Sequence, residues 1–504
     1  MHKARWGASA WGLAAGLAIA LSSCARNPAT GKREISLVSE SQEIQMGQQY
    51  AQQIVKSMGV YDDKKVQDYV SQLGLTLAAK SERPNLPWAF YVMDDPTVNA
   101  FALPGGSIFV TRGILTHMND EAELVGVLGH EIGHVTARHS VQQMTREQLA
   151  QIGLGVGSII SSDIAKYAGM ASQGLGMLFL KYGRDAESQS DQLGFKYMVR
   201  EGYDPRAMAD MFTTLERVSR LEGAGDIPEW QSTHPNPGNR VQATLQRLDT
   251  LSVPLDQLRK GRDEYLPIVA GMTYGEDPRQ GYVEGNTFYH PGLRFKLELP
   301  AGWQSKNSPE ALVAISPEQD AMLQLTAPGA GSPDEAAKQF LGQEGIKSTQ
   351  TSSAAINGLP AVSSYFEAQT EQGAVQGLVS FIRFGDLTYR ILGYTPSGKL
   401  QARDEAFRKA IGSFSELTDS TRLQAQPYKV ELVKAEREMT IVEFNQAHPS
   451  TIPVERVAVV NGMDTPDQRI AAGTTMKRVI GGTGAPALRQ AAPADSAKAG
   501  GAGQ

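Results

Sequence analysis

The pattern of apolar and polar positions changes once the chain has passed its midpoint. Up to about residue 250, apolar residues recur with the spacing of amphipathic helices, interrupted by two alternating stretches, WAFYVMDD and GSIFVTRGIL, that are typical of strands. From about Tyr282 the sequence becomes alternating, aromatic and rich in turn residues, which is typical of β-structure. The pattern predicts helices at 64–79, 120–150, 184–200, 205–221, 234–251, 333–345 and 400–413.

Turn and capping residues refine this outline. Ser39 or Ser41 is suited to cap a helix near the start of the chain, and Asp120 with Glu123 has the spacing of a capping box. The turn Pro104–Gly106 joins the two predicted strands. A strand pair therefore precedes the long predicted helix.

The first residues have the features of an export signal. Lys3 and Arg5 are basic, and Trp11 to Leu21 form an apolar segment that is too short to cross a bilayer of about 30 Å. The LSSC that ends at Cys24 resembles the bacterial lipobox, in which this cysteine carries the lipid; the alternative is a plain signal peptide with an incidental cysteine. Because alanine follows Cys24, the resemblance implies an outer-membrane lipoprotein of a Gram-negative bacterium that faces the periplasm.

Bulk properties set further limits. The 504 residues suggest about three domains, and a net charge of −6 argues against nucleic acid as a partner. A single cysteine excludes an internal disulfide framework. The Gly- and Ala-rich stretch 152–180 is apolar but too interrupted by charges to span a membrane, so we expect a helical hairpin, a mobile flap or core packing there.

The strongest chemical signal is the motif H-E-x-x-H at His130-Glu131-Ile132-Gly133-His134. On a helix, positions four residues apart differ by about 40°, so both imidazoles leave the same face, as two ligands of one Zn²⁺ require. Glu131 is then placed to take a proton from a zinc-activated water. The alternative is a polar helix face with a satisfied histidine pair.

A catalytic zinc needs a third protein ligand. His139 is near in sequence, but on a continuous helix it would point about 140° away from His134, so we expect it at the surface or at a helix end. Glu187, with Asp191 one turn later, is a better candidate, although this spacing is also common on solvated helix faces.

Four segments, in order, resemble one family. NAFALPGGSIFVTRGIL, ELVGVLGHEIGHVTARHS, ESQSDQLG and STHPNPGNR resemble the gluzincin metalloproteases that include HtpX and the CAAX prenyl proteases. The N-terminal NPATGKREISLVSESQEIQMG is similar to the lipoproteins of the soluble, periplasmic BepA-like branch, so that the resemblance covers residues 27–250. It implies one Zn²⁺ held by His130, His134 and Glu187. Glu131 would be the general base, and Asp191 would be a carboxylate that orients one of the ligands.

The same resemblance implies roles for residues farther along the chain. His234 would stabilise the oxyanion or occupy the open zinc position in a latent state, and Arg240 would help hold the tetrahedral intermediate; the alternative for His234 is a loop histidine packed by a proline. A strand at the edge of the cleft would pair with an extended substrate. The residues expected there are Ser107, Ile108, Phe109 and Val110.

Two units follow the protease region. Residues 280–420 weakly resemble the PsbP/Mog-type α/β sandwich, and residues 427–481 resemble a LysM module, although Met439-Thr440 stands where such modules usually have Asp-Thr. The fold expected is thus α+β: a mainly helical zincin-type domain with a small edge-strand sheet (24–275), an α/β sandwich (280–420) and a small βααβ unit (427–481). A signal peptide (1–23) and a disordered tail (482–504) flank them.

These features predict a zinc metalloendopeptidase of the bacterial cell envelope. Its expected substrates are misfolded or unassembled envelope proteins, its membrane contact is the lipid anchor only, and peptidoglycan contact through the LysM-like unit is a further option. The alternative function is a cell-wall-associated scaffold or chaperone with a latent zinc site that His234 caps.

Overall fold

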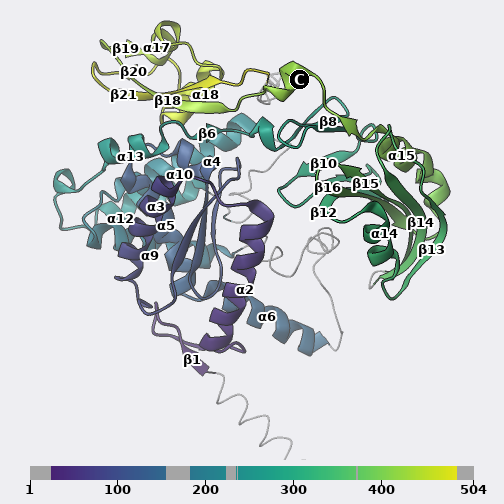
Figure 1. Cartoon of the computed structure of the whole chain (residues 1–504). Coiled ribbons are helices and arrows are strands. Elements are labelled where there is room, and N and C mark those ends of the chain that lie inside the picture. The colour runs from purple at the N-terminus through teal and green to yellow at the C-terminus, as the bar shows by residue number, and fades with distance from the viewer. Residues whose placement is uncertain (1–23, 155–181, 223–233, 235–236, 371–372, 485–504) are drawn as a thin grey trace, which may run out of the picture.

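The computed structural model describes residues 24–154, 182–222, 234, 237–370 and 373–484 (Figure 1). The expected signal peptide, most of the stretch 152–180 and the end of the tail lie outside these residues. Among the residues that the structure describes, no helix is long and apolar enough to cross a membrane.

The first region packs helices on both faces of a three-stranded sheet. Phe90, Val92 and Ile108 pack in the main core with α5 and α3, whereas Phe101 and Phe109 pack in a second cluster with residues of α2. Helix α5 is buried along its whole length, because α3, α9 and α10 cover it. The strands are β3 (Ala89–Met93), β4 (Ala100–Ala102) and β5 (Ser107–Thr111), and a hairpin of β1 (Cys24–Arg26) and β2 (Arg33–Ile35) precedes them. The helices are α2 (Glu40–Met58), α3 (Lys64–Ala78), α4 (Arg112–His117), α5 (Glu121–Thr136), α6 (His139–Leu154), α9 (Arg184–Arg200), α10 (Arg206–Glu222), α12 (Pro237–Leu248) and α13 (Arg262–Val269).

Capping residues begin these helices much as the sequence predicts. Ser39 caps α2 in a capping box with Gln42. The Asp120 side chain accepts a hydrogen bond from the Glu123 backbone N–H, but Glu123 accepts from the Asn119 N–H instead of completing a box. The start of α5 is therefore held by two carboxylates.

The prediction that the strand Ser107–Thr111 lies at the edge of the sheet is wrong. The order of the sheet is β3-β5-β4, so β5 pairs in parallel with β3 and antiparallel with β4. With both sides occupied, the backbone of Ser107, Ile108, Phe109 and Val110 has no free edge to offer a substrate. The edge position belongs to β4, which packs beside α5.

The single helix predicted over 120–150 is divided in two. Helix α5 ends at Thr136, Arg138 has a positive φ of 57°, and α6 begins at His139. The left-handed conformation of Arg138 is held by its guanidinium, which donates to Glu43 Oε2 at 2.9 Å and to the Val38 carbonyl at 3.0 Å. The direction of the chain changes at this point, with consequences for His139.

The second region is a seven-stranded antiparallel sheet covered on both faces. Helix α14 (Pro333–Leu341) packs on one face through Phe340, whereas α15 (Leu400–Ser413) and a smaller sheet cover the other, around Phe295, Leu297 and Phe407. The large sheet has the order β10-β11-β12-β16-β15-β14-β13 and the smaller one β17-β9-β8-β7. Their strands are β7 (Tyr282–Glu284), β8 (Thr287–His290), β9 (Phe295–Glu298), β10 (Gln304–Asn307), β11 (Leu312–Ile315), β12 (Met322–Gly329), β13 (Ile346–Ser352), β14 (Ala361–Thr370), β15 (Gly373–Phe384), β16 (Leu387–Pro396) and β17 (Ser415–Glu416).

The third region lies against the first (Figure 1). Strands β18 (Tyr428–Lys434) and β21 (Thr475–Gly481) form a sheet with β6 (Thr273–Tyr274), which comes directly after the first region. Lys477, fully buried on β21, donates to the carbonyls of Thr116 and Met118 at 2.9 and 2.8 Å. Between β18 and β21 lie β19 (Met439–Thr440), α17 (Ile441–Ala447), α18 (Val454–Val460) and β20 (Arg469–Ile470), the predicted β-α-α-β order; α16 (Ser420–Leu423) precedes the unit.

Candidate metal centre

Four buried side chains converge beside α5. The Nε2 atoms of His130 and His134 lie 3.0 Å apart, and Glu187 on α9 places Oε1 3.4 Å from His134 Nε2 and Oε2 3.7 Å from His130 Nε2. His234 adds Nδ1, which lies 3.3 Å from His130 Nε2 and 3.1 Å from Glu187 Oε1. All four offer a ligand atom within 4.8 Å of the others.

Glycines allow the two helices of this site to approach closely. A Cβ atom at Gly133 would lie 3.0 Å from Ser190 Cα, and one at Gly129 would lie 3.1 Å from Gly194 Cα. A Cβ atom at Gly194 would in turn lie 2.9 Å from the backbone nitrogen of His130. Helix α9 therefore passes directly over the His130–His134 turn, and this contact brings Glu187 to the two histidines.

The donor set fits a zinc ion. Two ligands at about 2.0–2.1 Å on a tetrahedral ion lie about 3.3 Å from one another, close to the spacing between the two histidines and Glu187. Both carboxylate oxygens of Glu131 are buried and accept no hydrogen bond from any residue that the structure describes. A hydrated metal ion beside this cluster of nitrogen and oxygen donors would satisfy a buried carboxylate that lacks a hydrogen-bond partner among the described residues.

The electrostatics keep the histidines neutral and Glu187 ionised. Burial lowers the pKa of His130 to about 4 and that of His134 well below its usual range. Burial works to raise the pKa of Glu187, but the neighbouring His234 and His134 outweigh it and hold the pKa well below normal. Neutral imidazole and an ionised carboxylate are the forms that bind a metal.

Asp191 and Arg240 support the first histidine. Asp191 Oδ1 lies 2.9 Å from His130 Nδ1, whose N–H donates to it, so that Nε2 faces the cluster with its lone pair. Arg240 donates to both Asp191 oxygens at 2.9 and 2.6 Å and lies over the Phe212 ring at 4.1 Å. Its Nη1 is 3.1 Å from Glu187 Oε2, so one guanidinium holds both Asp191 and Glu187 in place.

Glu131 and His234 face each other across the site. Burial raises the pKa of Glu131 to about 7, against the effect of His234, whose Nε2 lies 3.7 Å from Glu131 Oε1. Burial lowers the pKa of His234, but the Glu187 carboxylate more than compensates and the pKa is raised overall. His234, which lies in a bend outside the described helices and strands, is thus a buried imidazole between two carboxylates.

His139, expected at the surface or at a helix end, is the first residue of α6 and so lies at a helix end, but the surface alternative is wrong. The side chain is buried, and its Nδ1 lies 3.0 Å from His134 Nδ1. The expected direction of the His139 side chain held for one continuous helix, whereas the turn at Arg138 redirects His139 towards the site. Tyr182, which no sequence signal indicated, stacks on His134 with ring centroids 4.1 Å apart and shares a 2.7 Å hydrogen bond with Ser140.

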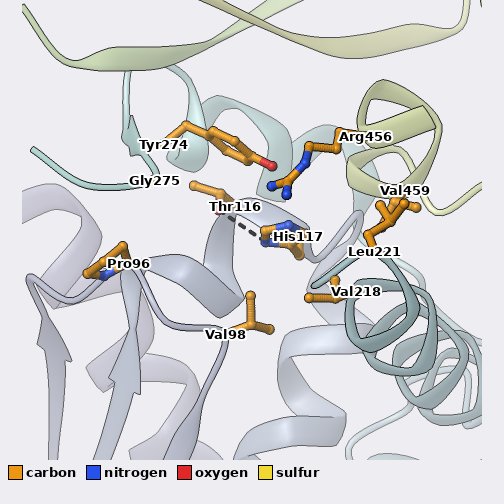
Figure 2. A pocket seen from close by; sticks show the side chains of 10 residues that line it. All are labelled: Pro96, Val98, Thr116, His117, Val218, Leu221, Tyr274, Gly275, Arg456 and Val459. Carbon is orange, nitrogen blue, oxygen red and sulfur yellow. Dashed lines mark hydrogen bonds between the residues drawn. The ribbon is translucent and has the colours of Figure 1, made fainter. Parts of the chain in front are cut away.

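A separate cavity of about 120 Å³ shares no residue with this centre. It lies where the first and third regions meet, and Figure 2 shows His117 and Thr116 of α4 facing Tyr274 of β6 and Arg456 of α18. Burial lowers the pKa of His117 to about 4. The cavity therefore belongs to the junction between regions, not to the metal centre.

Comparison with known proteins agrees with the site. Residues 64–248 match the model for "Peptidase family M48". The chain is 30% identical over 233 residues to the beta-barrel assembly-enhancing protease of Yersinia pestis, covering 44% of this chain and 47% of that protein. It is 31% identical over 190 residues to the mitochondrial metalloendopeptidase OMA1 of Arabidopsis thaliana, covering 37% of each. The chain thus spans about half or less of the length of these relatives. Among solved structures, cyanobacterial PsbP from Synechocystis matches with 12% identity and a TM-score of 0.23, covering 26% of this chain and 91% of that one.

Proposed function

We propose that the protein is a zinc-dependent endopeptidase of the bacterial cell envelope, and the match of residues 64–248 to the model for peptidase family M48 supports this proposal. The observation that carries the proposal is the buried set of His130, His134 and Glu187, with the Glu131 carboxylate facing it without a hydrogen-bond partner among the described residues. This arrangement is suited to hydrolysis with an activated water.

Zinc bound by His130, His134 and Glu187 would supply a Lewis acid that makes a water molecule nucleophilic near neutral pH. Glu131 would take the proton from the attacking water and pass it to the leaving amine. His234, whose Nδ1 lies 3.1 Å from Glu187 Oε1 and whose Nε2 lies 3.7 Å from Glu131 Oε1, would donate a hydrogen bond to the developing oxyanion.

For Arg240 the contacts favour a narrower role than the one that the resemblance implies. Its guanidinium is already engaged by Asp191 and Glu187, so it would act chiefly by holding those two side chains and by keeping the site positive. To contact the reacting atoms, the Arg240 guanidinium would have to break its interaction with Asp191 or Glu187.

We propose that an extended substrate pairs with β4. Leu103 donates to Ser107 and Thr111 donates to Asn99, so in this antiparallel register the backbone groups of Ala100 and Ala102 point away from β5. No described residue hydrogen-bonds to them. Backbone pairing would align a peptide beside α5 with little dependence on its side chains.

The substrates that we propose are misfolded or unassembled envelope proteins. The support is the name of the Yersinia relative, which points to β-barrel assembly, together with the lipobox-like LSSC that ends at Cys24. On this proposal Cys24 anchors the protein to the outer membrane, facing the periplasm. A Cys24→Ser variant should then lose labelling by palmitate analogues, and unchanged labelling would contradict the anchor.

The test of the activity is Glu131→Gln. This variant should keep its zinc and lose cleavage of an unfolded β-barrel protein, whereas Glu344→Gln, a change at an exposed glutamate of the second region, should leave both unchanged. Cleavage by Glu131→Gln at the normal rate would exclude the proposed mechanism.

A second candidate is a scaffold or chaperone with a latent zinc site, and the placement of His234 favours it. His234 Nδ1 lies within the cluster, 3.3 Å from His130 Nε2, where it can occupy the fourth zinc position. His234→Ala decides between the two: faster cleavage indicates a latent cap, and slower cleavage indicates a catalytic histidine. Co-sedimentation with peptidoglycan would test the wall contact of the third region.

A further inference from the structure

We propose that His139 is a positioning residue for the metal ligand His134: together with Gln189 it fixes the tautomer of His134 that leaves Nε2 free to bind the metal. The inference concerns metal binding at the site of the proposed function. It does not require that the site cleave peptides.

The contacts form a short chain of ring nitrogens across the two helices. His134 Nδ1 lies 3.0 Å from His139 Nδ1, and His139 Nε2 lies 2.7 Å from Gln189 Oε1. Ser190 Oγ lies 3.3 Å from the same His139 Nδ1. Gln189 and Ser190 belong to α9, the helix that also carries Glu187, so His139 links the second ligand to the element that carries the third.

The direction of the hydrogen bonds follows from which atoms can only accept. The Gln189 carbonyl oxygen has no proton, so His139 donates its Nε2–H to it. A neutral imidazole carries one proton, and His139 Nδ1 is then an acceptor. His134 must supply the proton between the two Nδ1 atoms, which leaves a lone pair on its Nε2, facing His130 and Glu187.

The two ligand histidines are therefore oriented by different chemistry. His130 donates its Nδ1–H to the carboxylate of Asp191, whereas His134 donates to a neutral imidazole. Ligating histidines almost always give their second N–H to such an acceptor, which sets the ring orientation and the basicity of the bound nitrogen. Without His139, His134 would have no ring acceptor among these contacts.

The backbone places His139 there at some cost. Arg138 adopts its left-handed conformation, uncommon for a residue with a side chain, and Glu43 holds its guanidinium. On a continuous α5 the His139 ring would leave the opposite side of the helix. The break between α5 and α6 is what returns an imidazole to the back of His134.

The experiment compares zinc affinity, by chelator competition, in four forms of the full chain: wild type, His139→Leu, Gln189→Leu and Gln189→Glu. His139→Leu should weaken zinc binding by roughly 10- to 100-fold, the range expected when the partner of a ligating histidine is lost. Gln189→Leu should weaken it less. Gln189→Glu keeps an oxygen that can only accept, so it should bind zinc at least as tightly as the wild type.

Nitrogen-15 NMR of the imidazoles in the metal-free protein reads the tautomer directly, which a merely structural role would not change. The wild type and Gln189→Glu should show His134 protonated at Nδ1. Unchanged zinc affinity in His139→Leu would overturn the proposal, and so would Gln189→Glu binding as weakly as Gln189→Leu, because the amide would then act as a donor. If His139→Leu does not fold, the Gln189 pair still decides, since that side chain is only partly buried.

Failure here is distinguishable from failure of the proposed function. If the wild type lacks the expected His134 tautomer but cleaves unfolded protein, the proposal for His139 is refuted and the proposed peptidase function stands. If zinc binding and the tautomer are as expected but no cleavage occurs, the proposal for His139 stands and the proposed peptidase function is refuted.

Discussion

Replacing Gly133 by alanine should separate the two helices that form the metal centre. The added methyl group would lie 3.0 Å from both Ser190 Cα and Ser190 O and 3.3 Å from Leu193 Cβ. Favourable contacts between carbon atoms begin at about 3.5 Å, so α9 must retreat by about 0.5 Å. Two of these three atoms belong to the backbone and cannot rotate away.

The expected magnitude combines two opposing effects. Overpacking of this kind costs about 1–3 kcal/mol, whereas alanine in place of glycine inside a helix stabilises by about 1 kcal/mol. We therefore expect the free energy of unfolding to fall by about 1 kcal/mol. The distance from His134 Nε2 to Glu187 Oε1, now 3.4 Å, would lengthen with α9, so zinc affinity should fall by about tenfold or more.

Urea unfolding of the metal-free protein and chelator competition for zinc measure the two effects. The matched control is Gly126→Ala on the same helix, where the nearest atom, Met198 Sδ, is 3.6 Å from the added methyl group. That variant should be more stable by up to about 1 kcal/mol and bind zinc normally. If Gly133→Ala gained the same stability and kept its zinc affinity, close packing of α9 would not be what positions Glu187.

Three further predictions concern the junction between regions and the metal. Burial lowers the pKa of His117 to about 4, against about 6.5 in the unfolded chain, so the unfolded state takes up the proton first as the pH falls. The free energy of unfolding should therefore drop by up to about 3 kcal/mol from pH 6.5 to 4, and urea denaturation of His117→Gln should show a smaller drop. Equal acid sensitivity of the variant would contradict this. Lys477→Met leaves two buried carbonyls without their donor and should lower the free energy of unfolding by about 2–4 kcal/mol. The control Lys434→Met, at an exposed position, should change it by less than about 0.5 kcal/mol. Similar effects of the two substitutions would contradict the role of Lys477 in holding the third region against the first. Chelation of zinc should lower the calorimetric Tm, also in Glu131→Gln, because the ion binds only the folded site; an unchanged Tm would mean that the protein does not hold the ion.

Helix positions and local motifs could be read from the sequence because they depend on neighbours in the chain. The spacing of His130 and His134 is set by the helical repeat, and the start of α2 at Ser39 by a capping box within four residues. Helix α9 has the predicted bounds for the same reason. The β-α-α-β order of the third region was expected from its resemblance to a LysM module.

Predictions that depended on distant neighbours were the ones that needed correction. The β5 strand has the alternation of any strand, and only its pairing with both β3 and β4 shows that it is central. The contact of His139 with His134 was missed because the break at Arg138 depends on Glu43, 95 residues earlier in the chain. No residue between 134 and 139 carries a local signal for that break.

The sequence by itself determined the chemistry that this protein can perform: one helix that presents two imidazoles and a carboxylate, and a second helix that carries Glu187 and Asp191. The tertiary structure decided how these groups are used. The glycine contacts between α5 and α9 bring Glu187 to the histidines, and the turn at Arg138 returns His139 to the back of His134. Periodicity encodes which face of a helix a residue occupies, but the distance between two helices and the direction of the chain after a break depend on the packing of residues far apart in the sequence.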